Sequence, residues 1–133
     1  MSNDKTLVPL HSKFFGTFNS GILHYCGNSS QHIESFKKIS GLRAVILNSM
    51  GDLNMVQDLQ KKLGDKICIV LIDICPVESE LEDYLKQIKK LLSPKGLIIN
   101  IIAPETIAYK NGGYVFTHQD PIRIANKIVK FFR

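Results

Sequence analysis

The feature that most constrains the fold is a nearly continuous apolar run, Ile67-Cys68-Ile69-Val70-Leu71-Ile72, rich in β-branched residues. Such a run is typical of a strand covered on both faces, as in a parallel sheet. Glu78 to Leu92 follow with apolar residues at helical spacing, and Ser93-Pro94 ends that pattern. Parallel strands need a crossover connection of this kind, so the two segments predict an α/β unit.

The same alternation extends from Gly21 to the end of the chain. Further strands are predicted at Ile22–Cys26, Leu42–Leu47, Leu97–Ile102 and Tyr114–Thr117. Helices are predicted to begin near Ser29 or Ser30, at Asp52 and at Asp120-Pro121. We therefore expect a flavodoxin-like α/β domain with a doubly wound, five-stranded parallel sheet. Its fourth helix, between residues 104 and 111, is expected to be short or absent.

The first 20 residues stand apart as an N-terminal extension of the domain expected over residues 21–133. Within the extension, Thr6 to Leu10 is consistent with a short edge strand that ends at proline. Phe14, Phe15 and Phe18 are too apolar for a solvated tail. We expect these phenylalanines to pack on the domain or on a partner.

Composition narrows the class of protein. A chain of 133 residues can bury one core without disulfides or metal. Its net charge of +5 is spread over several helical segments without an RNA-binding or zinc-finger motif, so nucleic-acid binding is not expected. The 3 cysteines, the absence of a secretory signal and the lack of a membrane-spanning apolar run predict a cytoplasmic protein.

Several segments resemble the receiver domain of response regulators. The strand that ends at Asp73 and the helix around Leu81 to Lys89 resemble the third strand and helix of that family. Leu97 to Ala103 resembles its fourth strand. Tyr114 to Pro121 and Ile124 to Arg133 resemble its fifth strand and last helix. The resemblance covers residues 21–133 and implies that Asp73 is the candidate phosphoacceptor of a two-component phosphorelay.

The phosphotransfer site of that family has four parts, and this chain keeps one. Asp73 matches the acceptor, but Cys26-Gly27 replace the acid pair that holds Mg²⁺. Ile102 replaces a hydroxyl residue, although Ala103 fits, and Thr117 replaces a lysine. These losses argue against tight Mg²⁺ binding and against phosphorylation by the usual route. The resemblance therefore implies a degenerate receiver with no catalytic residue, metal or cofactor.

The carboxyl ends of parallel strands form the crevice in which such folds bind ligands. The residues expected to line it around Asp73 are Cys26, Gly27, Cys75, Ile102, Ala103 and Thr117. Asp73 also has a structural interpretation, in which hydrogen bonds from amides or from hydroxyls such as that of Thr117 stabilise its charge. Cys26 and Cys75 are expected on neighbouring strands. Two interpretations of these cysteines remain open. Together with His118 they could form a metal or redox site, or they could simply be two small residues that line a pocket.

The resemblance implies a stand-alone signalling domain that acts through protein–protein contacts. The expected partners are a sensor kinase, another regulator or a second copy, and no membrane. The expected surface includes Tyr114, Ile122, Arg123 and Asn126. The alternative is a degenerate S-adenosylmethionine-dependent methyltransferase, because Leu91 to Gly96 resembles a run of that family. Tyr25 to Ser29, however, lacks the family's acidic, glycine-rich cofactor loop.

Overall fold

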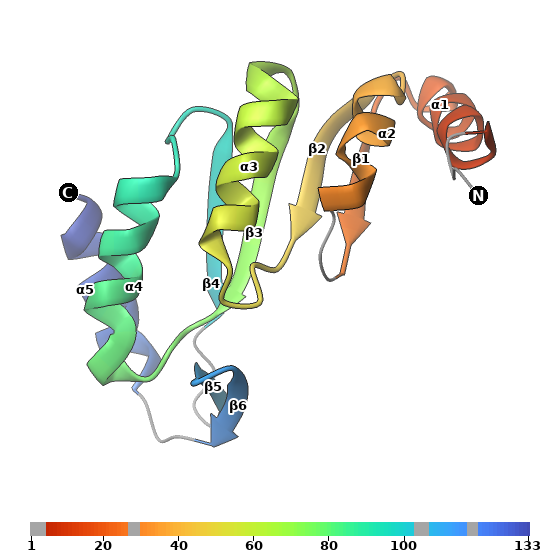
Figure 1. Cartoon of the computed structure of the whole chain (residues 1–133). Coiled ribbons are helices and arrows are strands. Elements are labelled where there is room, and N and C mark those ends of the chain that lie inside the picture. The colour runs from red at the N-terminus through yellow and green to blue at the C-terminus, as the bar shows by residue number, and fades with distance from the viewer. Residues whose placement is uncertain (1–4, 27–29, 103–106, 117–119) are drawn as a thin grey trace.

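The structure, a computed structural model, describes residues 5–26, 30–102, 107–116 and 120–133 (Figure 1). Its elements are α1 (Leu7–Thr17), β1 (Gly21–Tyr25), η2 (Ser30–His32), α2 (Ile33–Lys38), β2 (Leu42–Leu47), α3 (Leu53–Leu63), η3 (Gly64–Lys66), β3 (Cys68–Ile74), α4 (Glu78–Leu91), β4 (Leu97–Ile102), β5 (Ile107–Lys110), β6 (Gly113–Phe116) and α5 (Pro121–Phe132). None of the helices in these ranges has both the length and the apolar character needed to cross a membrane.

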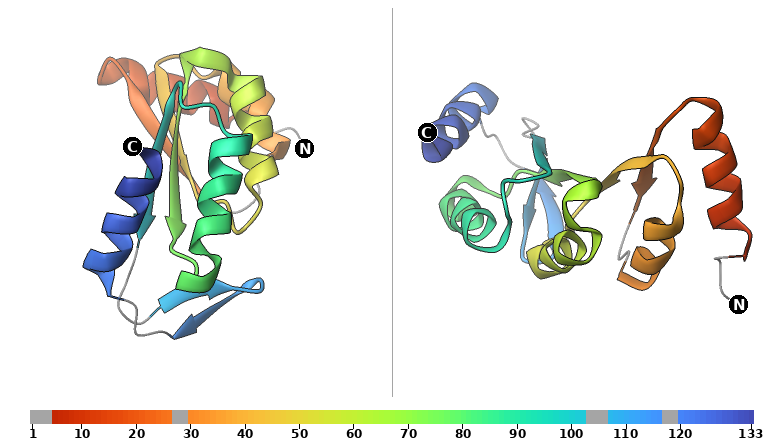
Figure 2. Two further views of the ribbon diagram at one scale, coloured as in Figure 1. Left: turned by 90° about the vertical axis from the view of Figure 1, so that its left-hand side faces the viewer. Right: turned by 90° about the horizontal axis from the view of Figure 1, so that it is seen from above.

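The predicted α/β architecture with a parallel sheet is confirmed. Strands β1 to β4 form a four-stranded sheet in the order β1-β2-β3-β4, and every neighbouring pair is parallel. The crossover helices α2, α3 and α4 all lie on one face of this sheet (Figure 2). Since each connection leads to the next strand in the same direction, crossovers of one hand place their helices on one side.

The prediction of a five-stranded, doubly wound sheet is wrong for the described residues. The segment expected as the fifth parallel strand forms β6, which pairs antiparallel with β5 in a separate two-stranded sheet. Asn111 and Gly112 connect the two strands with positive φ angles of 49° and 79°. Two such residues form the tight turn that favours a β-hairpin. A short or absent fourth helix was expected between residues 104 and 111. In the described part of that segment the chain forms the hairpin strand β5 instead.

The strand order also separates segments that were expected to be neighbours. In the flavodoxin-like order 2-1-3-4-5 the first strand lies beside the third. Here β2 lies between β1 and β3, so the prediction that Cys26 and Cys75 end neighbouring strands is wrong. The order of the described sheet never reverses, so it has no switch point of the kind that creates a ligand crevice in doubly wound sheets.

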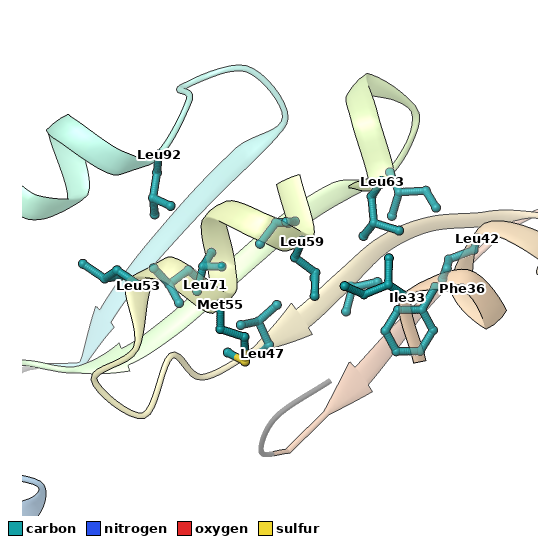
Figure 3. Packing of buried hydrophobic residues seen from close by; sticks show 14 of the residues in the cluster. Ile33, Phe36, Leu42, Leu47, Leu53, Met55, Leu59, Leu63, Leu71 and Leu92 are labelled. Atoms are coloured by element: carbon teal, nitrogen blue, oxygen red, sulfur yellow. The ribbon is translucent and has the colours of Figure 1, made fainter. Parts of the chain in front are cut away.

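The main core lies between the sheet and its crossover helices. Leu47 of β2 and Leu71 of β3 point toward apolar residues of the helices, such as Leu59 (Figure 3), and Val45 and Ile69 belong to the same buried cluster. Over residues 44–47 of β2 and along β3, the residues with odd numbers face the helices, because side chains alternate between the two faces. The strand expected to be covered on both faces is thus covered by crossover helices on one face only.

A second core cluster fixes α5. Ile124 of α5 is fully buried against Leu81 and Leu85 of α4 and against Cys75. Asp120 caps the helix as predicted, since its carboxylate accepts hydrogen bonds from the backbone N–H groups of Ile122 and Arg123. The last helix therefore lies beside α4, beyond the β4 edge of the sheet (Figure 2).

The N-terminal extension is helical, so the interpretation of Thr6 to Leu10 as an edge strand is wrong. Pro9 lies in the first turn of α1, where a missing backbone N–H costs no helical hydrogen bond. Phe15 is only 5% exposed and belongs to the main core, whereas Phe14 and Phe18 are exposed. One of the three phenylalanines thus attaches the extension to the domain.

We expect Gly21→Ala to weaken the attachment of α1, because a methyl group at that position would overlap the ring of Phe15. Overpacking of this kind costs about 1–3 kcal/mol. Thermal unfolding and limited proteolysis of the N-terminal segment measure the effect. The matched control is Gly16→Ala, since no atom lies within 4 Å of the added group at this helical position. Equal unfolding temperatures and equal proteolysis rates of the two variants would contradict the conclusion that Phe15 attaches α1 to the domain.

Candidate functional site

Asp73 is a buried carboxylate whose oxygens accept three hydrogen bonds. It precedes the last residue of β3, on the helix-covered side of the sheet, and is 4% exposed. Its Oδ1 accepts from the Ser49 N–H at 2.7 Å, and its Oδ2 accepts from the Ser49 and Tyr84 hydroxyls at 2.6 and 2.7 Å. We call these three residues the Asp73 cluster. The expectation that amides and hydroxyls would stabilise this charge is confirmed. Thr117, the donor suggested by the sequence, lies outside the described residues.

Ser49 reaches Asp73 because the chain turns sharply after β2. The N–H of Asp52 donates to the Ser49 carbonyl at 2.8 Å, and Met50 and Gly51 between them have φ angles of 52° and 83°. Asn48 donates from Nδ2 to the Ile72 carbonyl at 2.9 Å. The turn between β2 and α3 is thus tied to the carboxyl end of β3 by both a side-chain amide and a carboxylate.

Tyr84 brings α4 into the same cluster. Burial and the negative charge of Asp73 raise the pKa of its phenol far above the ordinary value. The hydroxyl therefore remains protonated and donates to the carboxylate at neutral pH. The sequence offered no local signal for Ser49 or Tyr84 as partners, because both lie more than ten residues from Asp73. One charged group joins β3, the turn after β2 and α4.

This geometry favours the structural interpretation of Asp73 over the phosphoacceptor interpretation. The hollow beside it has a volume of about 50 Å³ and is lined by residues that include Ser49, Pro76, Tyr84 and Tyr114. Ligand pockets for small molecules are usually about 300–1,000 Å³. An attacking carboxylate must meet its phosphoryl donor, whereas this side chain is closed off and already hydrogen-bonded. That Asp73 is not phosphorylated by the usual route stays a prediction, which an experiment can test.

Of the other residues predicted to line the site, the three that the structure describes are not gathered around Asp73. Cys75 is fully buried in the second core cluster, and burial raises the pKa of its thiol to about 11. Ile102 is 45% exposed on the opposite face of the sheet, and Cys26 is exposed at the end of the edge strand β1. Among the described residues, no three His, Cys, Asp or Glu side chains form a group that could hold a metal ion. The remaining predicted residues, Gly27, Ala103, Thr117 and His118, lie outside the described part of the chain.

Three of the four residues predicted for an interaction surface lie together. Ile122, Arg123 and Asn126 line an open hollow of about 380 Å³ on α5. Ile122 is 73% exposed, and Arg123 forms an ion pair with Glu78 of α4 at 2.5 Å. Tyr114 instead belongs to the hairpin and lines the hollow beside Asp73. The predicted surface is therefore divided between two places.

A larger apolar surface, which sequence reasoning missed, is the sheet face opposite the crossover helices (Figure 2). We call it the open sheet face. Its residues, assigned from strand pairing and alternation, are Ile22, His24, Ala44, Ile46, Cys68, Val70, Ile72, Ile74, Ile98, Asn100 and Ile102. None of them is Asp, Glu, Lys or Arg. Ile22, Ile98 and Ile102 are 56%, 55% and 45% exposed, so roughly half of each side chain contacts water.

We expect Tyr84→Phe to destabilise the fold by about 1.5–3 kcal/mol, the usual contribution of a hydrogen bond to a charged group. Urea unfolding measures the difference. Tyr25→Phe is the control, because in the described part of the chain the Tyr25 ring has aromatic contacts and its hydroxyl has no hydrogen bond. A loss of the same size in both variants would contradict the role of the Asp73 cluster.

Comparison of the unsubstituted protein with the Tyr84→Phe variant also gives a pH test. The folded pKa of Tyr84 lies above the value of about 10 for an unfolded tyrosine. Its stabilising contribution is therefore complete below pH 10 and decreases as the pH rises further. The unfolding free energy of Tyr84→Phe should lack this part of the alkaline decrease.

Comparisons of the chain with known protein families, with curated proteins and with solved structures found no match.

Proposed function

We propose that this domain acts by binding another protein across the open sheet face. The observation that carries the proposal is a sheet face with exposed isoleucines at both of its edge strands and no acidic or basic residue among its assigned positions, which in β2 begin after the exposed Arg43. Soluble proteins rarely leave large apolar surfaces to water, and those that do commonly use them to bind partners. Charged residues make up 22% of the chain, and most of those in the described ranges lie on the helices.

The energetics favour an apolar partner. Complete burial of an isoleucine side chain contributes about 1.5–3 kcal/mol, so the half-exposed Ile22, Ile98 and Ile102 offer roughly half of that each. Covering all three therefore contributes roughly 2–5 kcal/mol to binding. Because the face has no charged groups, recognition depends on shape and apolar contact. A partner therefore needs a matching uncharged surface.

A receiver-like signalling role is the more specific form of this proposal. The alternating strands and helices and the aspartate near the carboxyl end of β3 support it. In that form the partner is a sensor kinase, another regulator or a second copy, and the domain works in the cytoplasm. Such a role needs binding and does not need phosphotransfer at Asp73.

We expect no mass gain when the chain is incubated with acetyl phosphate and Mg²⁺, because Asp73 is buried and hydrogen-bonded. Intact-mass spectrometry measures the outcome, and a receiver domain with a complete phosphotransfer site serves as the positive control. Gain of one phosphoryl group, located at Asp73 by fragmentation, would show that the structural interpretation of this residue is wrong.

We expect a photoreactive residue at position 98 to cross-link to a partner in cells that make the protein. Of the two exposed isoleucines of β4 on the open sheet face, Ile98 is the one nearer the middle of the strand. The control position is Gln87, which is exposed on α4, a helix of the opposite face. A discrete adduct from position 98 alone supports the proposal, and its mass distinguishes a second copy from a different protein. Identical adducts from both positions, or none from position 98, would contradict it.

A further inference from the structure

The end of strand β1 holds a histidine and a cysteine side by side. His24 and Cys26 are two residues apart, so alternation places them on the same side of the strand, at the edge of the open sheet face. Both residues are exposed. Their Nε2 and Sγ atoms are 3.6 Å apart. The strand neighbour of His24 is Ile46, which offers no competing polar group.

The distance between the two atoms matches a pair of ligands on one tetrahedral zinc ion. Zn–S bonds are about 2.3 Å and Zn–N bonds about 2.0–2.1 Å, so tetrahedral geometry separates the two donor atoms by about 3.6 Å. The observed separation is also 3.6 Å. Thiolate and imidazole are the donors that structural zinc sites use. The same separation also fits a hydrogen bond between the two side chains in the absence of metal.

One chain supplies only half of such a site. Structural zinc sites have four protein ligands. Among the described residues no group of three ligating side chains exists, so this pair gains no third donor from its own described chain. We propose that His24 and Cys26 form half of a Zn²⁺ site that a second copy of the chain completes as Cys₂His₂.

Symmetry and charge both favour a second copy. A two-fold axis beside the pair brings the same two donors from each chain, so one self-complementary surface completes the site. Two thiolates neutralise Zn²⁺, so metal binding adds no net charge to two chains that each have a net charge of +5. Strand β1 has a neighbouring strand on one side only, and His24 lines a hollow of about 340 Å³ together with residues of α1 and α2.

The test is a Co²⁺ titration of the untagged, reduced chain, with light scattering to follow its mass. We expect thiolate-to-cobalt absorption that saturates at half a metal ion per chain, together with a doubling of the mass. Zn²⁺ should displace the cobalt and keep the dimer, and a chelator should restore the monomer. Binding releases the thiol protons, so the apparent affinity should rise with pH.

Matched variants locate the site. Cys26→Ser and His24→Ala are expected to lower the apparent metal affinity at least ~100-fold and to abolish the metal-dependent dimer. Cys68→Ser is the control, because Cys68 is a half-buried cysteine of the same sheet face two strands away. Circular dichroism verifies that all three variants are folded, which is expected for substitutions at the two exposed positions.

Three results would overturn the inference: no thiolate absorption, one metal ion bound per monomer, or an unchanged affinity in Cys26→Ser. The outcome is separate from that of the proposed function. Ile98→Lys disrupts the open sheet face far from β1, and it should leave metal binding intact. Metal binding without cross-linking from position 98, or cross-linking without metal binding, shows which of the two proposals fails.

Discussion

All three crossovers of the parallel sheet run in one direction, and this constraint decides which surfaces the domain buries. Helices α2, α3 and α4 cover one face, where Val45, Ile69 and Leu71 form the core. The other face keeps its exposed isoleucines. Since the order of the described strands never reverses, no crevice of the doubly wound kind opens at their carboxyl ends. The one-sided arrangement thus removes the usual ligand site of an α/β sheet and exposes an apolar surface instead.

The Asp73 cluster shows how the same polar residue can serve stability in place of chemistry. The Asp73 carboxylate accepts hydrogen bonds from Ser49 and Tyr84 and so connects a loop, a strand and a helix. Both of its oxygens take part in these hydrogen bonds. A reactive carboxylate needs room for its substrate and a free approach to one oxygen. Burial leaves Asp73 no room for a substrate, and the three hydrogen bonds occupy both of its oxygens. The geometry therefore agrees better with recognition by surface contact than with phosphotransfer.

Much of the secondary structure was predictable from local patterns. The apolar run at Ile67 became β3, the periodic segment from Glu78 became α4, and Asp120 caps α5. The hairpin of β5 and β6 was missed, although Asn111-Gly112 is a strong turn signal. The apolar character of Tyr114 to Thr117 suggested a parallel strand, because such short runs do not show which partner they pair with.

The candidate sites depended on information that no local pattern contains. Asp73 was predicted to need hydrogen-bond donors, but Ser49 and Tyr84 reach it only through the packing of separate elements. Cys26 and Cys75 looked like neighbours until β2 was found between their strands. By itself, the sequence determined the strands, helices and caps, because propensities, periodicity and capping act over a few residues. Only the tertiary structure decided the strand order, the open sheet face and the hydrogen bonds of Ser49 and Tyr84 to Asp73. Those features depend on how segments far apart in the chain pack, and on the conformations that this packing selects.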